Sequence, residues 1–139
     1  MGQPVDLVAK ALRHKLMRDG AASLTDAEWH LLRVSHFLHA LEDQTLDRIL
    51  GDAPLADLLA LGDALEAIAI PAAAKHVRAI AAEIAHANDP GLGLQRPLIV
   101  ASLTARLSSA ISPMRTDIEQ RLLEYAFRQR EATDHPPRA

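Results

Sequence analysis

Apolar residues recur every three or four positions along most of this chain, the spacing that places them on one face of an α-helix. The pattern predicts a first helix at residues 4–19, ended by Gly20, and a second at residues 26–50, ended by Gly51. We expect one apolar side of the second helix to face the core. The residues of this side are Leu31, Val34, Phe37, Leu38, Leu41 and Ile49.

The start of the second helix carries the clearest local signal in the chain. Thr25 stands where a helix cap accepts a backbone hydrogen bond, and Glu28, three residues later, can accept one from the amide of the cap itself. Leu24 and Trp29 flank this capping box at the positions of a hydrophobic staple. The sequence therefore predicts that the helix begins directly after Thr25.

The second half of the chain is also expected to be helical. Pro54 fits a first turn with Asp52 or Ala53 as the cap, and Gly62 leaves open whether residues 55–70 form one helix or two. Ser112 and Pro113 fit the cap and first turn of a last helix. The remaining segments are predicted as helices at residues 71–87, 98–110 and 113–130, a loop at 88–97 and a disordered tail at 132–139.

Composition agrees with an all-α fold. The apolar residues are mostly Ala and Leu, which favour helix, and aromatic residues make up only 3% of the chain. A chain of 139 residues suits a single compact domain, here predicted over residues 1–131 with five or six helices. The absence of cysteine fits a cytoplasmic setting, and charged residues interrupt the N-terminal segment, so we expect neither a signal peptide nor a membrane span.

Charge is distributed unevenly along the sequence. Residues 19–66 hold ten acidic and two basic side chains, whereas residues 1–18 hold four basic and one acidic, and residues 67–139 hold nine basic and seven acidic. A nucleic-acid-binding domain needs clustered basic residues to neutralise phosphates, so direct nucleic-acid binding is not expected. The acidic middle segment instead favours contact with a basic protein.

The acidic segment yields the first functional hypothesis, a non-enzymatic binding or regulatory protein without a cofactor. Trp29 lies on the same helix face as several carboxylates, and a patch of this composition suits the centre of a protein interface. Self-association into a homo-oligomer stays open. The residues predicted to contact the partner are Trp29, Glu42, Asp43, Asp47 and Asp57.

Histidine chemistry is the alternative hypothesis. His36, His39 and Asp43 share the face opposite the predicted core, and two imidazoles with a carboxylate can bind a divalent metal such as zinc. The Ser35–His36 pair is also similar to the phosphoacceptor box of sensor histidine kinases, which would imply a small phosphotransfer domain. Phe37 occupies the position of the acidic residue in that box.

The order of features over residues 24–83 resembles a bacterial family of helical domains whose best-known member is a DNA-mimic protein. The matching pieces are residues 24–29, residues 63–68 and the small-residue helix start at residues 71–74. The Asn-Gly-Gly-Phe motif of the family would fall at residues 43–46, where this chain has Asp-Gln-Thr-Leu. The resemblance implies an all-α fold and carboxylates that contact the DNA-reading surface of a regulator.

Overall fold

The computed structural model describes the backbone of residues 3–134 and the side chains of residues 5–130. This part of the chain contains helices and turns and no strand, so the predicted all-α class is confirmed. Six of its α-helices have 13 to 20 residues and α3 has seven. The α-helices are α1 (Gln3–Asp19), α2 (Asp26–Glu42), α3 (Leu46–Asp52), α4 (Leu55–Ala67), α5 (Pro71–Ala87), α6 (Arg96–Ile111) and α7 (Arg115–Asp134), and the short 3₁₀ segments are η1 (Ala21–Ser23), η2 (Pro90–Gln95) and η3 (Ser112–Met114).

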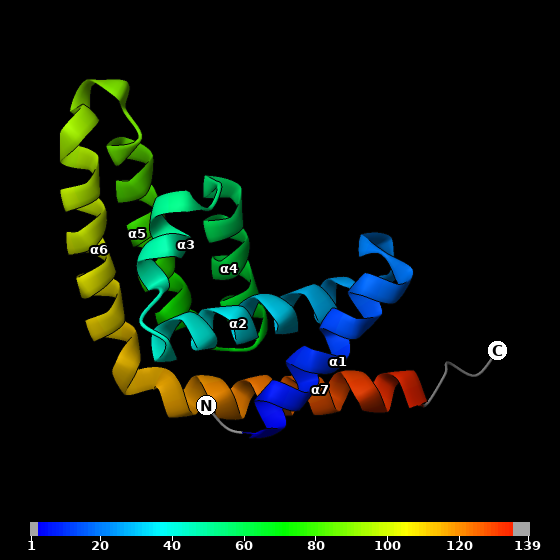
Figure 1. Ribbon diagram of the computed structural model, residues 1–139. Coiled ribbons are helices and arrows are strands. Elements are labelled where there is room, and N and C mark those ends of the chain that lie inside the picture. The colour runs from blue at the N-terminus through cyan, green and yellow to red at the C-terminus, as the bar shows by residue number, and fades with distance from the viewer. Residues whose placement is uncertain (1–2, 135–139) are drawn as a thin grey trace.

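The helices are arranged around α2. Figure 1 shows α5 and α6 side by side as an antiparallel hairpin at one end of the molecule. After α6 the chain turns into α7, which runs along the base, while α3 and α4 lie between α2 and the hairpin. Because α2 contacts α1, α3, α4 and α7, it is the central helix of the fold.

The core is aliphatic and continuous across the helices. The predicted inner side of α2 is confirmed for Leu31, Val34, Phe37 and Leu38, which are buried, whereas Leu41 on α2 and Ile49 on α3 are half-buried against the same core. Ser35 is the one buried polar residue among the described side chains, and its Oγ donates to the Leu31 carbonyl at 2.8 Å. This hydrogen bond satisfies the hydroxyl within the core.

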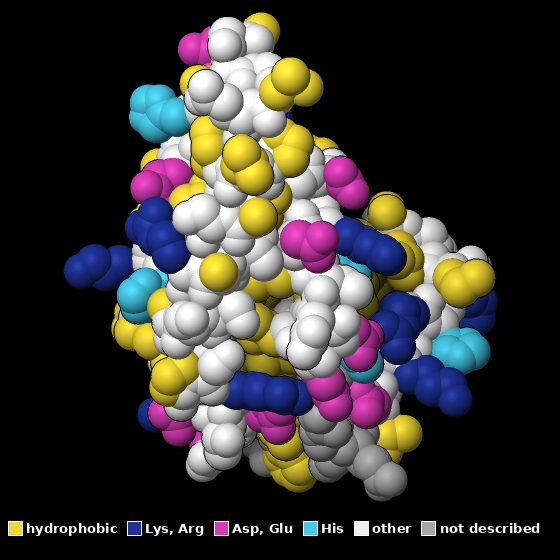
Figure 2. All heavy atoms as spheres, turned by 60° about the vertical axis from the view of Figure 1, so that its left-hand side comes forward, with side chains coloured by type: hydrophobic (Ala, Val, Ile, Leu, Met, Phe, Trp, Pro, Cys, Tyr) yellow, Lys and Arg dark blue, Asp and Glu magenta, His cyan; other side chains and the backbone are white. Residues whose placement is uncertain are grey.

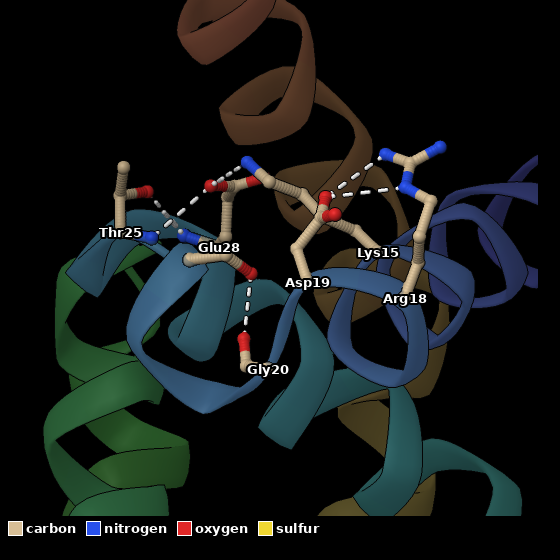
Figure 3. Close-up of polar contacts among 7 residues, drawn as sticks. Lys15, Arg18, Asp19, Gly20, Thr25 and Glu28 are labelled. Atoms are coloured by element: carbon tan, nitrogen blue, oxygen red, sulfur yellow. Dashed lines mark hydrogen bonds and ion pairs between the residues drawn. The ribbon is translucent and has the colours of Figure 1, made fainter.

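The capping box at the start of α2 forms as the sequence predicts (Figure 3). The Glu28 amide donates to Thr25 Oγ1 at 3.1 Å, and the Thr25 amide donates to Glu28 Oε1 at 3.1 Å. Lys15 of α1 adds an ion pair to the same carboxylate, with Nζ 2.9 Å from Oε1. Glu28 therefore stabilises the first turn of α2 and also links α2 to α1 through Lys15.

The predicted second helix is not continuous, and this expectation was wrong. α2 ends at Glu42, and Gln44 adopts the left-handed conformation with φ of 58°. The Thr45 amide then donates back to the Ala40 carbonyl at 2.9 Å, which closes the helix end as in a Schellman motif. The chain reverses here, and α3 starts a new direction at Leu46.

Gly62 lies inside one continuous helix, which settles the open question about residues 55–70. A Cβ atom at Gly62 would lie 3.0 Å from Cγ of Arg78, so the missing side chain gives the stem of this α5 residue room to cross α4. The Arg78 guanidinium then pairs with Asp63 at 2.8 Å and with Glu66. The predicted cap at Asp52 or Ala53 is wrong, because Pro54 occupies the cap position and α4 begins at Leu55.

In the C-terminal half the helix boundaries differ from the predicted ones by a few residues. The expected loop contains η2, and α6 begins at Arg96, whose guanidinium donates to the Gly51 carbonyl at the end of α3 at 2.9 Å. Ser112 does not cap α7, since its Oγ donates to the Ser108 carbonyl at 2.7 Å and η3 intervenes.

The C-terminal tail predicted at residues 132–139 falls only partly within the described chain. α7 continues to Asp134, so the first three residues of the predicted tail are helical, and residues 135–139 lie outside the described part. Among the described helices, none combines the length and the apolar character needed to cross a membrane.

The end of α4 yields a prediction about stability. Ala69 has φ of 71°, and the Ala69 and Ile70 amides close a Schellman motif by donating to the Glu66 and Leu65 carbonyls at 3.0 Å. A left-handed conformation costs alanine conformational energy, whereas glycine adopts it without that cost. We therefore expect Ala69→Gly to raise the free energy of unfolding by about 1 kcal/mol in denaturant titrations, after the larger entropy of the unfolded glycine is subtracted.

The matched control is Ala82→Gly, which replaces an exposed alanine in the middle of α5 and should lower stability by about 1 kcal/mol. If Ala69→Gly and Ala82→Gly lower the free energy of unfolding equally, the strained conformation at Ala69 is contradicted.

Candidate functional site

The carboxylates predicted to form one acidic face are dispersed. Glu42 pairs with Arg115 of α7 at 3.2 Å, so it joins two helices. Asp43 lies in the turn after α2, Asp47 in the first turn of α3 and Asp57 in the first turn of α4, and all three are exposed.

Ion pairs between helices neutralise four of the ten carboxylates in the acidic middle segment. The cations come from the two flanking segments: Lys15 binds Glu28, Arg78 binds Asp63 and Glu66, and Arg115 binds Glu42. The uneven charge along the sequence is therefore partly balanced within the fold.

A groove runs along α2 between α1, α3 and α4, and we call it the α2 groove. Its first hollow has a volume of about 560 Å³. Trp29 and Leu32 of α2 form its half-buried apolar floor together with neighbouring aliphatic residues. The lining residues are Arg13, Leu16, Trp29, Leu32, Arg33, His36, Phe37, Ile49, Ala53, Asp57 and Leu61.

The second hollow of the α2 groove is smaller and more polar, with a volume of about 370 Å³. It shares Arg13, His36 and Ile49 with the first, so the two hollows adjoin each other along α2. The residues added here are His39, Ala40, Asp43, Thr45 and Arg48. The groove thus receives side chains from α1, α2, α3 and α4, including three of the predicted partner-binding residues, Trp29, Asp43 and Asp57.

The groove is lined by three arginines that lack a hydrogen-bonding partner. The guanidinium groups of Arg13, Arg33 and Arg48 donate to no acceptor within the described residues, whereas the other described arginines do make polar contacts. Arg33 is placed over the Trp29 ring, with its Cζ 5.1 Å from the ring centroid, which is a cation–π distance. This contact does not occupy the N–H donors of Arg33 with an acceptor from the described residues.

The sequence contained part of this signal. Trp29, Arg33 and His36 are spaced by four and three residues and so share one face of α2. Arg13 and Arg48 lie on other helices, and no spacing in the sequence connects them with Arg33. The sequence pattern therefore indicated the aromatic and acidic residues of the groove but not its arginines.

The histidine cluster proposed as a metal site is only partly assembled. His36, His39 and Asp43 all line the second hollow, yet no set of three His, Cys, Asp or Glu residues in the described part is arranged to hold a metal ion. Nε2 of His39 lies 3.1 Å from Oδ1 of Asp6 on α1, within ion-pair distance but without hydrogen-bond geometry. His36 is exposed and has no hydrogen bond to an acidic side chain among the described residues.

Two further hollows lie between α5 and α6, on the face seen in Figure 2, where hydrophobic side chains gather along the hairpin. They measure about 610 and 760 Å³ and are therefore larger than those of the α2 groove. Their one arginine, Arg106, is already paired with Glu83 at 3.0 Å. Since no unpaired guanidinium faces these hollows, the α2 groove is the stronger candidate site.

The wall of the α2 groove formed by α1 is fixed by Glu28. Partial burial alone would raise the pKa of this carboxyl, but the hydrogen bond from the Thr25 amide and the ion pair with Lys15 outweigh burial and hold the pKa below its ordinary value. A depressed pKa in the folded state contributes stability above the pKa of the unfolded chain, and this contribution disappears as the pH falls through the folded value.

This linkage predicts how Glu28→Gln behaves. Gln keeps the shape of the capping box and loses the charge, so at neutral pH we expect the free energy of unfolding to fall by up to about 1 kcal/mol. The difference from the wild type should shrink as the pH falls below about 4.5, measured by denaturant titration at several pH values. Glu124→Gln, which removes longer ion pairs of 3.7 and 3.8 Å on the outer face of α7, is the control with a smaller loss. A pH-independent difference for Glu28→Gln would contradict the assignment.

Comparisons with known proteins do not add a functional assignment. No family model, curated protein or solved structure matches this chain.

Proposed function

We propose that this protein is a non-enzymatic binding protein that docks a segment of a partner protein in the α2 groove. The observation that carries the proposal is a half-buried Trp29 on an apolar floor, with Arg13 and Arg33 lining the same hollow and Arg48 the adjoining one. None of the three guanidinium groups donates to an acceptor among the described residues. Tryptophan and arginine are the residues most enriched among the strongly contributing positions of protein interfaces.

The dimensions of the groove support a protein segment as the ligand. Its two adjoining hollows follow α2 from Trp29 to Asp43, a distance of about 21 Å along the helix axis. Small-molecule sites usually enclose their ligand, whereas an elongated open groove with an apolar floor suits an amphipathic helix or an extended peptide.

The non-enzymatic character is part of the proposal. In the phosphotransfer alternative the acceptor is His36, which is exposed and has no hydrogen-bonded acidic side chain among the described residues to activate its imidazole. The neighbouring Ser35 hydroxyl is buried and donates to the Leu31 carbonyl. Asp43 and Asp57 line the groove, whereas Asp47 lies outside both hollows. Contact of these carboxylates with a basic partner stays a prediction. The absence of cysteine supports a cytoplasmic setting, and the DNA-mimic-like resemblance, which stays a prediction, would place the protein among bacterial regulators.

Site-specific photo-crosslinking tests the proposed function. A benzoylphenylalanine at position 36, in place of the exposed His36, projects into both hollows. Irradiation in cells of the source organism should give a discrete adduct with another protein, and Trp29→Ala or Arg33→Ala should reduce it strongly because each removes an anchor of the groove.

The matched control carries the same photoreactive residue at Phe127, which is 66% exposed on α7 and lies outside the groove. Circular dichroism checks that each variant keeps its helical content. Adducts of equal yield at positions 36 and 127, or no adduct at position 36, would overturn the proposed function.

A further inference from the structure

The charge balance of the α2 groove is opposite to that of the whole chain. The protein has a formal net charge of −3, yet Arg13, Arg33 and Arg48 outnumber Asp43 and Asp57 among the charged residues lining the groove, before the histidines are counted. Arg13 stands where the two hollows meet, so the excess positive charge lies at the centre of the groove.

The three guanidinium groups are suited to carboxylates. An arginine presents several donors in a plane, which match both oxygens of a carboxylate, and such charge-assisted pairs are stronger than neutral hydrogen bonds. The guanidinium of Arg33 lies over the Trp29 ring, and its N–H groups meet no acceptor among the described residues. Within the described part of the chain no carboxylate pairs with the three arginines, whereas Arg78, Arg106 and Arg115 each bind a carboxylate.

The groove fits a polyphosphate ligand poorly, because three arginines neutralise few of the closely spaced charges of a nucleic-acid backbone. The floor of Leu16, Trp29 and Leu32 instead offers contact to aliphatic or aromatic side chains. Carboxylates beside apolar side chains are the surface of an acidic amphipathic helix.

From this arrangement we infer that the α2 groove recognises an acidic amphipathic segment of a partner protein. Apolar side chains of the segment occupy the hollow over Trp29, and its Asp or Glu side chains pair with Arg13, Arg33 and Arg48. The inference rests on the proposed function and specifies its partner. The net charge of the chain is −3, so the average charge outside the groove disfavours binding of such a segment elsewhere.

The experiment selects peptides from a random library of about 16 residues, a length of ~24 Å as a helix, on the immobilised full chain. Recovered peptides should be enriched in Asp and Glu beside Leu, Ile or Phe. Trp29 is the only tryptophan of the chain, so its fluorescence reports occupancy of the groove when the peptides themselves lack tryptophan.

Charge reversal gives the quantitative readout. The double variant Arg13→Glu with Arg48→Glu changes two exposed side chains of the groove and should weaken the selected peptides at least about tenfold, with a smaller dependence of affinity on salt. The control, Arg121→Glu with Arg128→Glu, makes the same change of charge on the outer face of α7 and should alter affinity less than about twofold at moderate salt.

The outcomes separate the inference from the proposed function. Recovery of basic or charge-neutral peptides that perturb Trp29 would overturn the acidic partner and leave the docking groove in place. Recovery of acidic peptides that both double variants bind equally would also overturn the inference. If no selected peptide perturbs Trp29, the docking function itself is contradicted.

Discussion

The reversal of the chain at Gln44 is the constraint on which the groove depends. A continuous helix through residue 50 would carry Arg48 and Ile49 away along the axis of α2. Because Gln44 takes the left-handed conformation and the Thr45 amide closes onto Ala40, α3 instead returns beside α2. α3 is held there by its buried residues Leu46 and Leu50 and by the hydrogen bond from Arg96 to the Gly51 carbonyl.

Ion pairs within the fold determine which charged side chains can still bind a partner. The acidic middle of the sequence folds between two more basic segments, and their cations pair with its carboxylates across helix interfaces. Such partly exposed pairs contribute little stability individually, but they lower the charge of the surface outside the groove. Arg13, Arg33 and Arg48 take no part in this pairing. Arg13 and Arg33 line the hollow of Trp29 and Arg48 lines the adjoining hollow, so a chain of net negative charge carries a locally cationic groove.

Local signals in the sequence predicted much of the fold. The capping box at Thr25 and Glu28 placed the start of α2, Pro71 placed the start of α5, and aliphatic spacing identified the buried side of α2. The prediction of one continuous helix failed at Gln44, a residue without a strong conformational preference that ends α2 with a positive φ more typical of glycine. The arginines of the groove were missed because they come from α1, α2 and α3, and no spacing in the sequence specifies the relative positions of these helices.

Nuclear Overhauser effects from the Ile49 methyl groups test the account most directly. In the structure Ile49 lines the same hollow as Arg13, His36 and Phe37, so we predict cross-peaks between its methyl protons and the side chains of one or more of these residues. In a continuous helix Ile49 would lie about 18 Å beyond Phe37, far outside the range of the effect. Cross-peaks from Ile49 confined to sequence neighbours within one helical turn would contradict the reversal at Gln44 and the groove built on it.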